Sequence, residues 1–360
     1  MRLASAFIAL LLSAGSALAA QTPFATITEK VIDTVIRPGY ARLATAGGDM
    51  ETAMGALCAH PGELALDSAR SRFSGLVDAW SRIELIRFGP VREDNRYEKL
   101  NYWPDRKGRG LHQVRQILAS RDPDALSVET LREKSVAVQG LGALEFVLYG
   151  KGAHTLIDRP AANASSYRCH YGLAIAGAVH QTAAELAKDW QSDTGYVAIM
   201  TSPGPDNPVY QAEDEVIREL LRAMTEELQF ARDIKLKTAL ADKPEKANYK
   251  RAPFWRSGLT ARAVAANGAS VAELFAKGDF AAALPEEERW ITGSVAFELA
   301  QAGKVLGRIE TPVVRMFTEP NTRDLLSVAI IALNGAGEAI GNHYAGATGL
   351  TLGFNSLDGD

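Results

Sequence analysis

Apolar residues recur along most of this chain with the spacing of α-helices. In the segment 208–240, Ile217, Leu220, Met224 and Leu228 follow one another at intervals of three or four residues, which places them on one helix face. The same period predicts three further helices, over residues 62–90, 165–190 and 322–344. Long runs that alternate apolar and polar residues, as strands do, are absent from the sequence. The pattern therefore predicts an all-α fold built of helix bundles.

One segment interrupts this helical pattern near the middle of the chain. Thr201–Tyr210 contains three prolines and one glycine, which is typical of a linker. The linker divides the chain that follows the N-terminus into two halves of similar size. We therefore expect two helical-bundle domains, over residues 20–200 and 201–360.

Two short motifs recur in these halves at nearly one offset. Tyr102-Trp103 is followed 152 positions later by Phe254-Trp255, and Gly140–Glu145 is followed 153 positions later by Gly293–Glu298. Two matches at nearly the same spacing favour an ancient duplication. Two coincidences in an alanine-rich helical chain remain the alternative.

The N-terminus has the pattern of a secretory signal peptide. Arg2 precedes a short apolar run, and Ala17-Leu18-Ala19 fits the A-x-A cleavage pattern. No cysteine directly follows the apolar run, so a lipid anchor is not expected. We predict cleavage of residues 1–19 and a soluble periplasmic protein that does not span the membrane.

Composition and cysteine usage add two expectations. Hydrophobic residues make up 47% of the 360 residues and the formal net charge is −4, so no basic face is implied and no nucleic-acid partner is expected. Cys58 and Cys169 are the only cysteines. In an oxidising compartment two cysteines favour one disulfide, with two buried free thiols as the alternative.

The apolar stretch Ser135–Gly150 contains a single carboxylate, Glu145. A buried carboxylate costs several kcal/mol unless it is paired, hydrogen-bonded or bound to a metal. Its surroundings therefore predict a specific partner for Glu145.

A second inward-facing carboxylate is expected nearby. The apolar stripe of the helix predicted over 62–90, continued by the same step, reaches Glu84 and then Arg87. One interpretation is a structural ion pair in which Arg87 or Arg82 binds Glu145. Another is an oxygen-ligand site in which both carboxylates hold a metal ion or a small ligand. A third is a different helix phase that leaves Glu84 in solvent.

Several motifs, in one order, resemble those of the imelysin family. They are Trp80–Pro90, Tyr102–Arg106, Phe254–Gly258 and the closing Gly353–Asp360. The resemblance covers most of the chain after residue 19. It implies an exported bacterial protein of two helical-bundle domains related by duplication, from a family in which many members are iron-regulated and some were first described as metallopeptidases.

The family's G-x-H-x-x-E motif, proposed to bind metal, lies over Gly140–Glu145 in this chain. The glycine and the glutamate are present, but Gly142 stands where the histidine ligand is expected. Gly142 offers no nitrogen ligand and leaves a notch one turn from Glu145. This departure argues against peptidase chemistry, and no catalytic residue is assigned.

The resemblance and the residues together predict a periplasmic binding protein accessory to iron or haem uptake. Iron is the expected metal, with Glu145 and Glu84 as its ligands. The alternatives are a metal-dependent peptidase and a non-catalytic scaffold that binds a periplasmic or outer-membrane protein. The residues expected around the ligand are Trp80, Arg87, Tyr102, Trp103, Asp105, Arg106, Gly140 and Gly142.

Overall fold

The structure is a computed structural model that describes residues 23–158 and 163–352. Within these ranges the chain forms helices and no strand, which confirms the all-α prediction. The predicted signal peptide, residues 1–19, and the closing motif Gly353–Asp360 lie outside the described residues.

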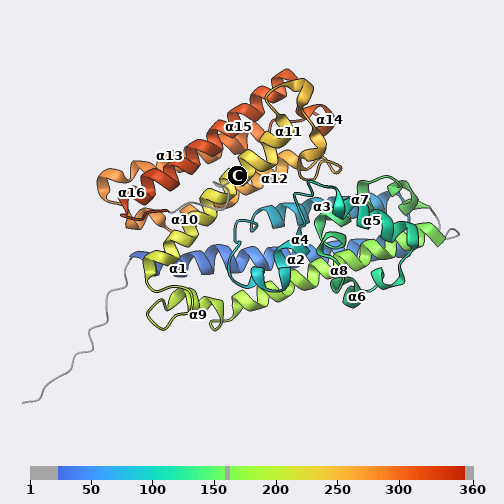
Figure 1. Cartoon of the computed structure of the whole chain (residues 1–360), viewed down its shortest axis with the longest axis horizontal. Coiled ribbons are helices and arrows are strands. Elements are labelled where there is room, and N and C mark those ends of the chain that lie inside the picture. Colours follow the sequence, from blue (N-terminus) through green and yellow to red (C-terminus); the bar gives the residue numbers. More distant parts are fainter. Residues whose placement is uncertain (1–22, 159–162, 353–360) are drawn as a thin grey trace, which may run out of the picture.

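The helices before residue 202 form what we term the first helix group. Its longest helices, α2 and α8, pack along each other, and α3 packs on α2 (Figure 1). The group consists of α1 (Pro23–Val31), η1 (Ile32–Ile36), α2 (Arg37–Ala59), α3 (Glu63–Ser81), η2 (Gly89–Asn95), α4 (Arg96–Leu100), α5 (Arg109–Ser120), η3 (Pro123–Ala125), α6 (Val128–Arg132), η4 (Val136–Val138), α7 (Leu141–Tyr149), η5 (Ala153–Ile157), α8 (Asn163–Gln191) and α9 (Tyr196–Thr201).

The helices after residue 212 form the second helix group. In it α13 packs on α15, α12 on α13, and α10 on α15. The group consists of α10 (Glu213–Gln229), η6 (Phe230–Lys237), α11 (Thr238–Leu240), η7 (Pro244–Lys246), η8 (Tyr249–Arg251), α12 (Thr260–Lys277), η9 (Phe280–Ala283), η10 (Glu286–Glu288), α13 (Trp290–Leu306), α14 (Val313–Met316), α15 (Pro320–Glu338), η11 (Ala339–Tyr344) and α16 (Ala345–Ala347).

The two helix groups lie side by side and share a contact surface. Figure 1 shows the second group, coloured yellow to red, along one side of the first, coloured blue to green. Helix α12 packs on α3, and α1 contacts α10. The non-helical stretch between α9 and α10 contains most of the predicted linker Thr201–Tyr210. The domain boundaries themselves stay a prediction.

The disulfide prediction is confirmed. Cys58 in α2 and Cys169 in α8 are bonded, with their Cα atoms 5.5 Å apart. The bond joins the two helices that make the most extensive contact of the first group. In the chain-entropy model, closing so long a loop stabilises the fold by about 4–5 kcal/mol.

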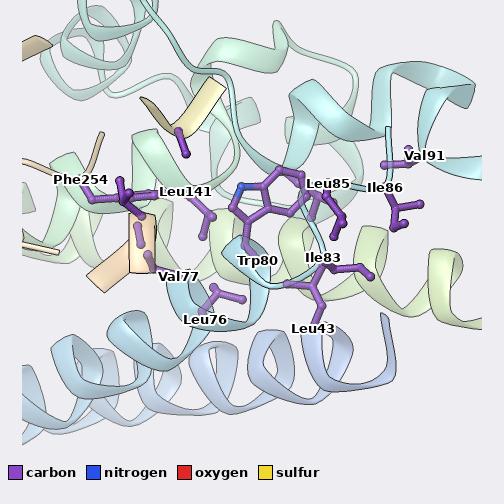
Figure 2. Packing of buried hydrophobic residues seen from close by; sticks show 14 of the residues in the cluster. Leu43, Leu76, Val77, Trp80, Ile83, Leu85, Ile86, Val91, Leu141 and Phe254 are labelled. Atoms are coloured by element: carbon purple, nitrogen blue, oxygen red, sulfur yellow. The ribbon is translucent and has the colours of Figure 1, made fainter. Parts of the chain in front are cut away.

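The helix predicted over 62–90 is shorter than expected. It ends at Ser81, and a turn follows in which Glu84 N donates to the Trp80 carbonyl over 2.8 Å. The residues 83–86 are all buried, so they do not form the single apolar stripe on which the longer helix was predicted. Figure 2 shows Trp80 among buried hydrophobic side chains such as Leu76 and Leu141, so Trp80 belongs to the core.

Two other helices also differ from the sequence prediction. The segment predicted as a helix over 208–240 begins at Glu213 and contains the π-helical stretch η6, and α15 continues into the π-helical η11.

The run Pro320–Ala347 is long and apolar enough to cross a membrane, by length and composition alone. A core helix of a soluble protein passes the same test, and α15 packs on α13.

Candidate functional site

A cavity of about 600 Å³ lies between the two helix groups. Its lining residues come from segments 101–114 and 137–146 of the first group and from segment 234–256 of the second group. Small-molecule sites typically have volumes of about 300–1,000 Å³ and favour such junctions. The cavity is therefore the candidate functional site.

Most of the residues expected around a ligand do line this cavity. They are Tyr102, Trp103, Asp105, Arg106 and Gly142, together with the predicted metal ligand Glu145. The predicted residues Trp80, Glu84, Arg87 and Gly140 are not among its lining residues.

Gly140 acts through its backbone, one residue before α7. Its φ is 82°, and an added Cβ would collide with the carbonyl oxygens of Lys99 and Leu100. Glycine is the residue that adopts this conformation without strain. Gly140 therefore lets α7 begin directly beside the chain that leads into the Tyr102 loop.

Gly142 lies two residues further along, in the first turn of α7, and lines the cavity. An added Cβ would meet only the Tyr102 carbonyl oxygen, at 4.0 Å. The notch expected at Gly142 is therefore present and opens into the cavity.

Glu145 anchors a loop of the second helix group. Its Oε1 accepts hydrogen bonds from Arg256 N (3.1 Å), Ser257 N (3.0 Å) and Ser257 Oγ (2.8 Å), and its Oε2 lies 3.6 Å from Arg256 Nη1. Burial raises the pKa of Glu145, while the bonds from Ser257 and the charge of Arg256 oppose the rise. The single carboxylate of this apolar helix thus joins the two helix groups.

Glu84 takes part in a separate set of contacts, which we term the buried ion cluster. Its Oε2 accepts hydrogen bonds from Lys235 Nζ (2.6 Å) and Asn267 Nδ2 (3.1 Å). Arg87 Nη2 donates to Glu227 Oε2 over 2.8 Å, and Lys235 Nζ lies 3.6 Å from Glu227 Oε1. Burial raises the pKa of Glu227. Two carboxylates and two cations thus balance one another across the contact between the groups.

The arginine partner predicted for Glu145 is wrong. Arg87 binds Glu227, and Arg82 pairs with Asp78 over 3.0 Å. Their placement changes because α3 ends at Ser81, so these arginines do not continue its stripe. The solvent-exposed alternative for Glu84 is also wrong, because only 2% of the residue is exposed.

Both carboxylates therefore have their own hydrogen-bond donors and cationic partners. These donors favour an ion-pair role for Glu84 and Glu145 over a metal-ligand role. Among the described residues, His, Cys, Asp and Glu nowhere form a group of three or more able to hold a metal ion. The residues at the degenerate motif do not fit a bare metal ion, since Gly142 adds no donor.

Asp105, the other acidic residue of the cavity, is also engaged. Its Oδ1 accepts from Arg109 N over 2.8 Å, and its Oδ2 accepts from Leu111 N over 3.1 Å. These bonds satisfy backbone donors in the first turn of α5. Asp105 thus shapes the loop that carries Tyr102 and Trp103 to the cavity.

The basic lining residues are less engaged than the acidic ones. Arg106, Lys250 and Arg251 are exposed at the cavity. Arg256 lies deeper, with its guanidinium carbon 4.2 Å from the ring centroid of Trp255 and 5.5 Å from that of Phe146. Burial lowers the pKa of Arg256, and Glu145 opposes that shift. The cavity therefore presents positive charge and aromatic rings together.

The cavity and the buried ion cluster touch through two aromatic rings. Trp103, which lines the cavity, packs edge-on against Phe230 with the ring centroids 5.7 Å apart. The Phe230 centroid lies 4.4 Å from the guanidinium carbon of Arg87 and 5.2 Å from Lys235 Nζ. The Trp103 side of the cavity is thus connected to the buried ion cluster through the ring of Phe230.

Sequence reasoning missed the partners that the second helix group supplies. Glu227 lies on the apolar face of α10, and Lys235 comes later, in η6. Both residues are buried. A charged residue at a position of the apolar face predicted that Glu84 points inward. The same reasoning predicts that Glu227 points inward. The position of Lys235 depends on the π-helical turn of η6, which a regular 3.6-residue period does not predict.

An all-α protein with a ligand-sized cavity between two helix groups is the class that this fold and site define. The family model of imelysin (Peptidase_M75) matches residues 36–340, so the chain belongs to the imelysin family. A comparison with curated proteins finds no match.

Two solved structures share the fold. An imelysin-like protein from Psychrobacter arcticum 273-4 is 18% identical, with a TM-score of 0.73, 92% of this chain covered and 97% of that chain covered. A protein named an iron-regulated protein A precursor, from Parabacteroides distasonis ATCC 8503, is 15% identical, with a TM-score of 0.70 and the same two coverages. Likeness at this identity concerns the fold alone.

Proposed function

We propose that this protein binds an iron compound, either haem or an iron chelate, in the cavity between its helix groups. The observation that carries the proposal is a cavity of about 600 Å³ whose lining combines aromatic rings with basic side chains from both groups. One structural neighbour is named as iron-regulated, which supports a relation to iron. The protein then serves as an accessory to iron or haem uptake.

The charges around the cavity favour an iron compound over a bare iron ion. Asp105 and Glu145 already accept hydrogen bonds within the protein, whereas Arg106, Lys250 and Arg251 face solvent. Free positive charge repels a metal cation and attracts a ligand that carries carboxylates or other ionised oxygens. Such a compound supplies the metal's ligands itself.

We propose the periplasm as the place of action. The support is the signal-peptide pattern of residues 1–19 and one disulfide, Cys58–Cys169, of the kind found in exported proteins. Fractionation of expressing cells is the test. We expect the protein in the osmotic-shock fluid, shortened by its first 19 residues, and its retention in the cytoplasm with an intact N-terminus contradicts the proposal.

We also propose that two domains, residues 20–200 and 201–360, arose by duplication. Tyr102-Trp103 and Phe254-Trp255, which echo each other in sequence, line one cavity from the two helix groups. The second echo is weaker in three dimensions, because Glu145 is buried whereas Glu298 is only partly buried. A cavity built from equivalent loops is a natural product of such a duplication.

Thermal unfolding with added ligands tests the binding function. We expect haem or a ferric chelate to raise the melting temperature, because a ligand at 100 times its Kd stabilises the folded state by about 2.7 kcal/mol. Ferrous iron, ferric citrate and haem are the probes, and zinc chloride is the control for non-specific metal effects. Identical melting curves with every iron probe contradict the proposal. Incubation with unfolded casein, with and without zinc, tests the peptidase alternative in the same samples.

A further inference from the structure

We infer that the cavity recognises a flat aromatic ring system with ionised carboxylates, and that it does so without contacting the iron. This inference rests on the proposed function and deepens it. Four features of the cavity carry it: an unused amide, an open helix terminus, an excess of basic groups and aromatic walls. All four belong to lining residues of the cavity.

Asn101 supplies the unused amide. It lines the cavity, and only 6% of the residue is exposed. Its backbone N–H donates to the Tyr97 carbonyl over 3.0 Å, but its side chain has no hydrogen-bond partner among residues 23–158 and 163–352. The side-chain nitrogen and oxygen are not completely buried, so they are accessible from the cavity and a ligand can bond to them. Asn101 thus offers one donor group and one acceptor in the cavity wall.

The N-terminus of α7 opens at the same cavity. The helix has nine residues, Leu141–Tyr149, and the first N–H groups of any α-helix lack partners within it. Gly142 leaves this terminus uncovered, because even an added Cβ would reach only the Tyr102 carbonyl oxygen, at 4.0 Å. Free N–H groups and the helix dipole favour an anion at this place. The absent side chain at Gly142 thus exposes backbone donors.

Basic groups outnumber acidic groups in the cavity lining. The basic residues are Arg106, Lys250, Arg251 and Arg256, and the acidic ones are Asp105 and Glu145. Oε1 of Glu145 and both carboxylate oxygens of Asp105 accept hydrogen bonds from the protein. The uncompensated charge is therefore positive, and it attracts a carboxylate rather than a metal cation.

Aromatic rings form a large part of the cavity wall. Tyr102 and Trp103 come from the first helix group, and Phe254 and Trp255 come from the second. Large aromatic side chains favour flat unsaturated ligands, which bury much area against them in stacked or edge-on contacts. Together with the positive charge, these rings select a planar aromatic carboxylate. Two sources have this chemistry: a tetrapyrrole with carboxylate side chains, and an iron-chelating aryl carboxylate.

Equilibrium titration of the purified protein separates ring and carboxylate recognition from iron recognition. The probes are haem, metal-free protoporphyrin IX and its dimethyl ester, followed by 2,3-dihydroxybenzoate and catechol. We expect metal-free protoporphyrin IX to bind within about threefold of haem, because the ring and carboxylates are shared. We expect the dimethyl ester to bind at least tenfold more weakly. If 2,3-dihydroxybenzoate binds more strongly than the porphyrin, and catechol, which lacks the carboxylate, binds more weakly than 2,3-dihydroxybenzoate, the ligand is an aryl carboxylate. This result also supports the inference.

Two variants test the named groups in the same titration. Asn101→Asp keeps the shape of the side chain but adds negative charge, and Arg251→Ala removes a basic group at the cavity. Each is expected to weaken porphyrin binding about tenfold. Arg308→Ala, at an exposed position outside the cavity, is the control and is expected to bind like the wild type. Circular dichroism and a melting curve show that each variant is folded.

The outcomes distinguish this inference from the proposed function. Binding of haem or ferric citrate without binding of metal-free porphyrin or 2,3-dihydroxybenzoate overturns the inference and leaves the proposed function intact. Equal affinity for the porphyrin and its dimethyl ester overturns the role of the carboxylates. If none of the probes binds, both the inference and the proposed function are contradicted.

Discussion

The buried ion cluster and the cavity both lie between the helix groups, yet they use polar groups in opposite ways. In the cluster, Glu84 and Glu227 are matched by Lys235 and Arg87 within 2.6–3.6 Å. In the cavity, the amide of Asn101 has no side-chain partner among the described residues. The four charges of the cluster pair with one another, although Glu227 Oε1, 3.6 Å from Lys235 Nζ, has no hydrogen bond within the described part of the chain; the amide of Asn101, in contrast, is accessible from the cavity.

This difference shows why buried charge alone is a poor indicator of function. Glu84 and Glu145 are the most unusual residues of their segments, and both serve to hold the helix groups together. The groups that a ligand can use are less conspicuous in the sequence: an asparagine, a glycine and exposed basic residues. A buried carboxylate that is matched by cations of the protein has little bonding capacity left for a ligand, whereas an accessible amide without a partner can still bond to one.

The largest effect is expected from breaking the cluster at Lys235. Lys235→Met keeps the length of the side chain but leaves the buried carboxylates of Glu84 and Glu227 without their shared cation. We expect the free energy of unfolding to fall by about 3–5 kcal/mol, as for other buried pairs that lose one partner. Urea denaturation measures it.

Lys237→Met is the matched control for this change. Lys237 lies in the same π-helical stretch, but its side chain is 51% exposed and its partner Asp233 is four residues away. Surface pairs of this kind contribute less than about 1 kcal/mol. Equal losses for the two variants contradict a stabilising role specific to the cluster.

A smaller loss is expected at Glu145, where the cavity meets the contact between the groups. Glu145→Gln keeps an oxygen to accept the donors of Arg256 and Ser257 but removes the negative charge beside Arg256. The guanidinium retains its contact with the Trp255 ring, 4.2 Å away, so we expect a loss of about 1–3 kcal/mol. The measurement is again urea denaturation.

Glu298→Gln is the control, since Glu298 echoes Glu145 in sequence but is only partly buried. We expect a change within about 0.5 kcal/mol. If Glu145→Gln leaves stability as unchanged as this control, the two helix groups are not held together at Glu145.

The smallest effect concerns a partly buried pair away from both regions, Arg132 and Glu185, whose side chains are 18% and 34% exposed. Glu185 in α8 accepts two hydrogen bonds from Arg132 in α6, of 2.9 and 2.7 Å, and these bonds lower its pKa. A carboxyl whose pKa is lowered by folding stabilises above its unfolded pKa, roughly 4.3, and loses that contribution as the pH falls through the folded value. We expect Glu185→Gln to cost about 0.3–1 kcal/mol at pH 7 and nothing near pH 2. A cost that persists at pH 2 contradicts this origin.

Local patterns in the sequence were sufficient for much of the fold. The helical period predicted the all-α class, the two cysteines predicted their bond, and the break at Thr201–Tyr210 is largely non-helical. The predicted extent of α3 was wrong at its C-terminal end, because the buried residues 83–86 do not lie on one helix face. A 3.6-residue period identifies a helix with one apolar and one polar face. It does not predict where such a helix ends if all the residues that follow are buried.

The candidate site was predictable only in part, for the same physical reason. The Tyr102 loop and the notch at Gly142 were found, since both are local features. The partners of Glu145 and Glu84 lie 111 and 151 residues away, at Arg256 and Lys235. Contacts so distant in sequence depend on how the helix groups pack, which no local spacing contains.

The most direct test of the central claim is haem binding by a variant whose cavity is filled. Gly142→Phe places a ring in the notch, where a Cβ meets only one atom at 4.0 Å, so the fold is expected to be kept. Gly293→Phe is the control, because Gly293 lies in α13 with open space around it and outside the cavity. We predict that Gly142→Phe binds haem at least tenfold more weakly than the wild type, while Gly293→Phe binds it equally well. Equal binding by both folded variants contradicts the assignment of the cavity as the binding site.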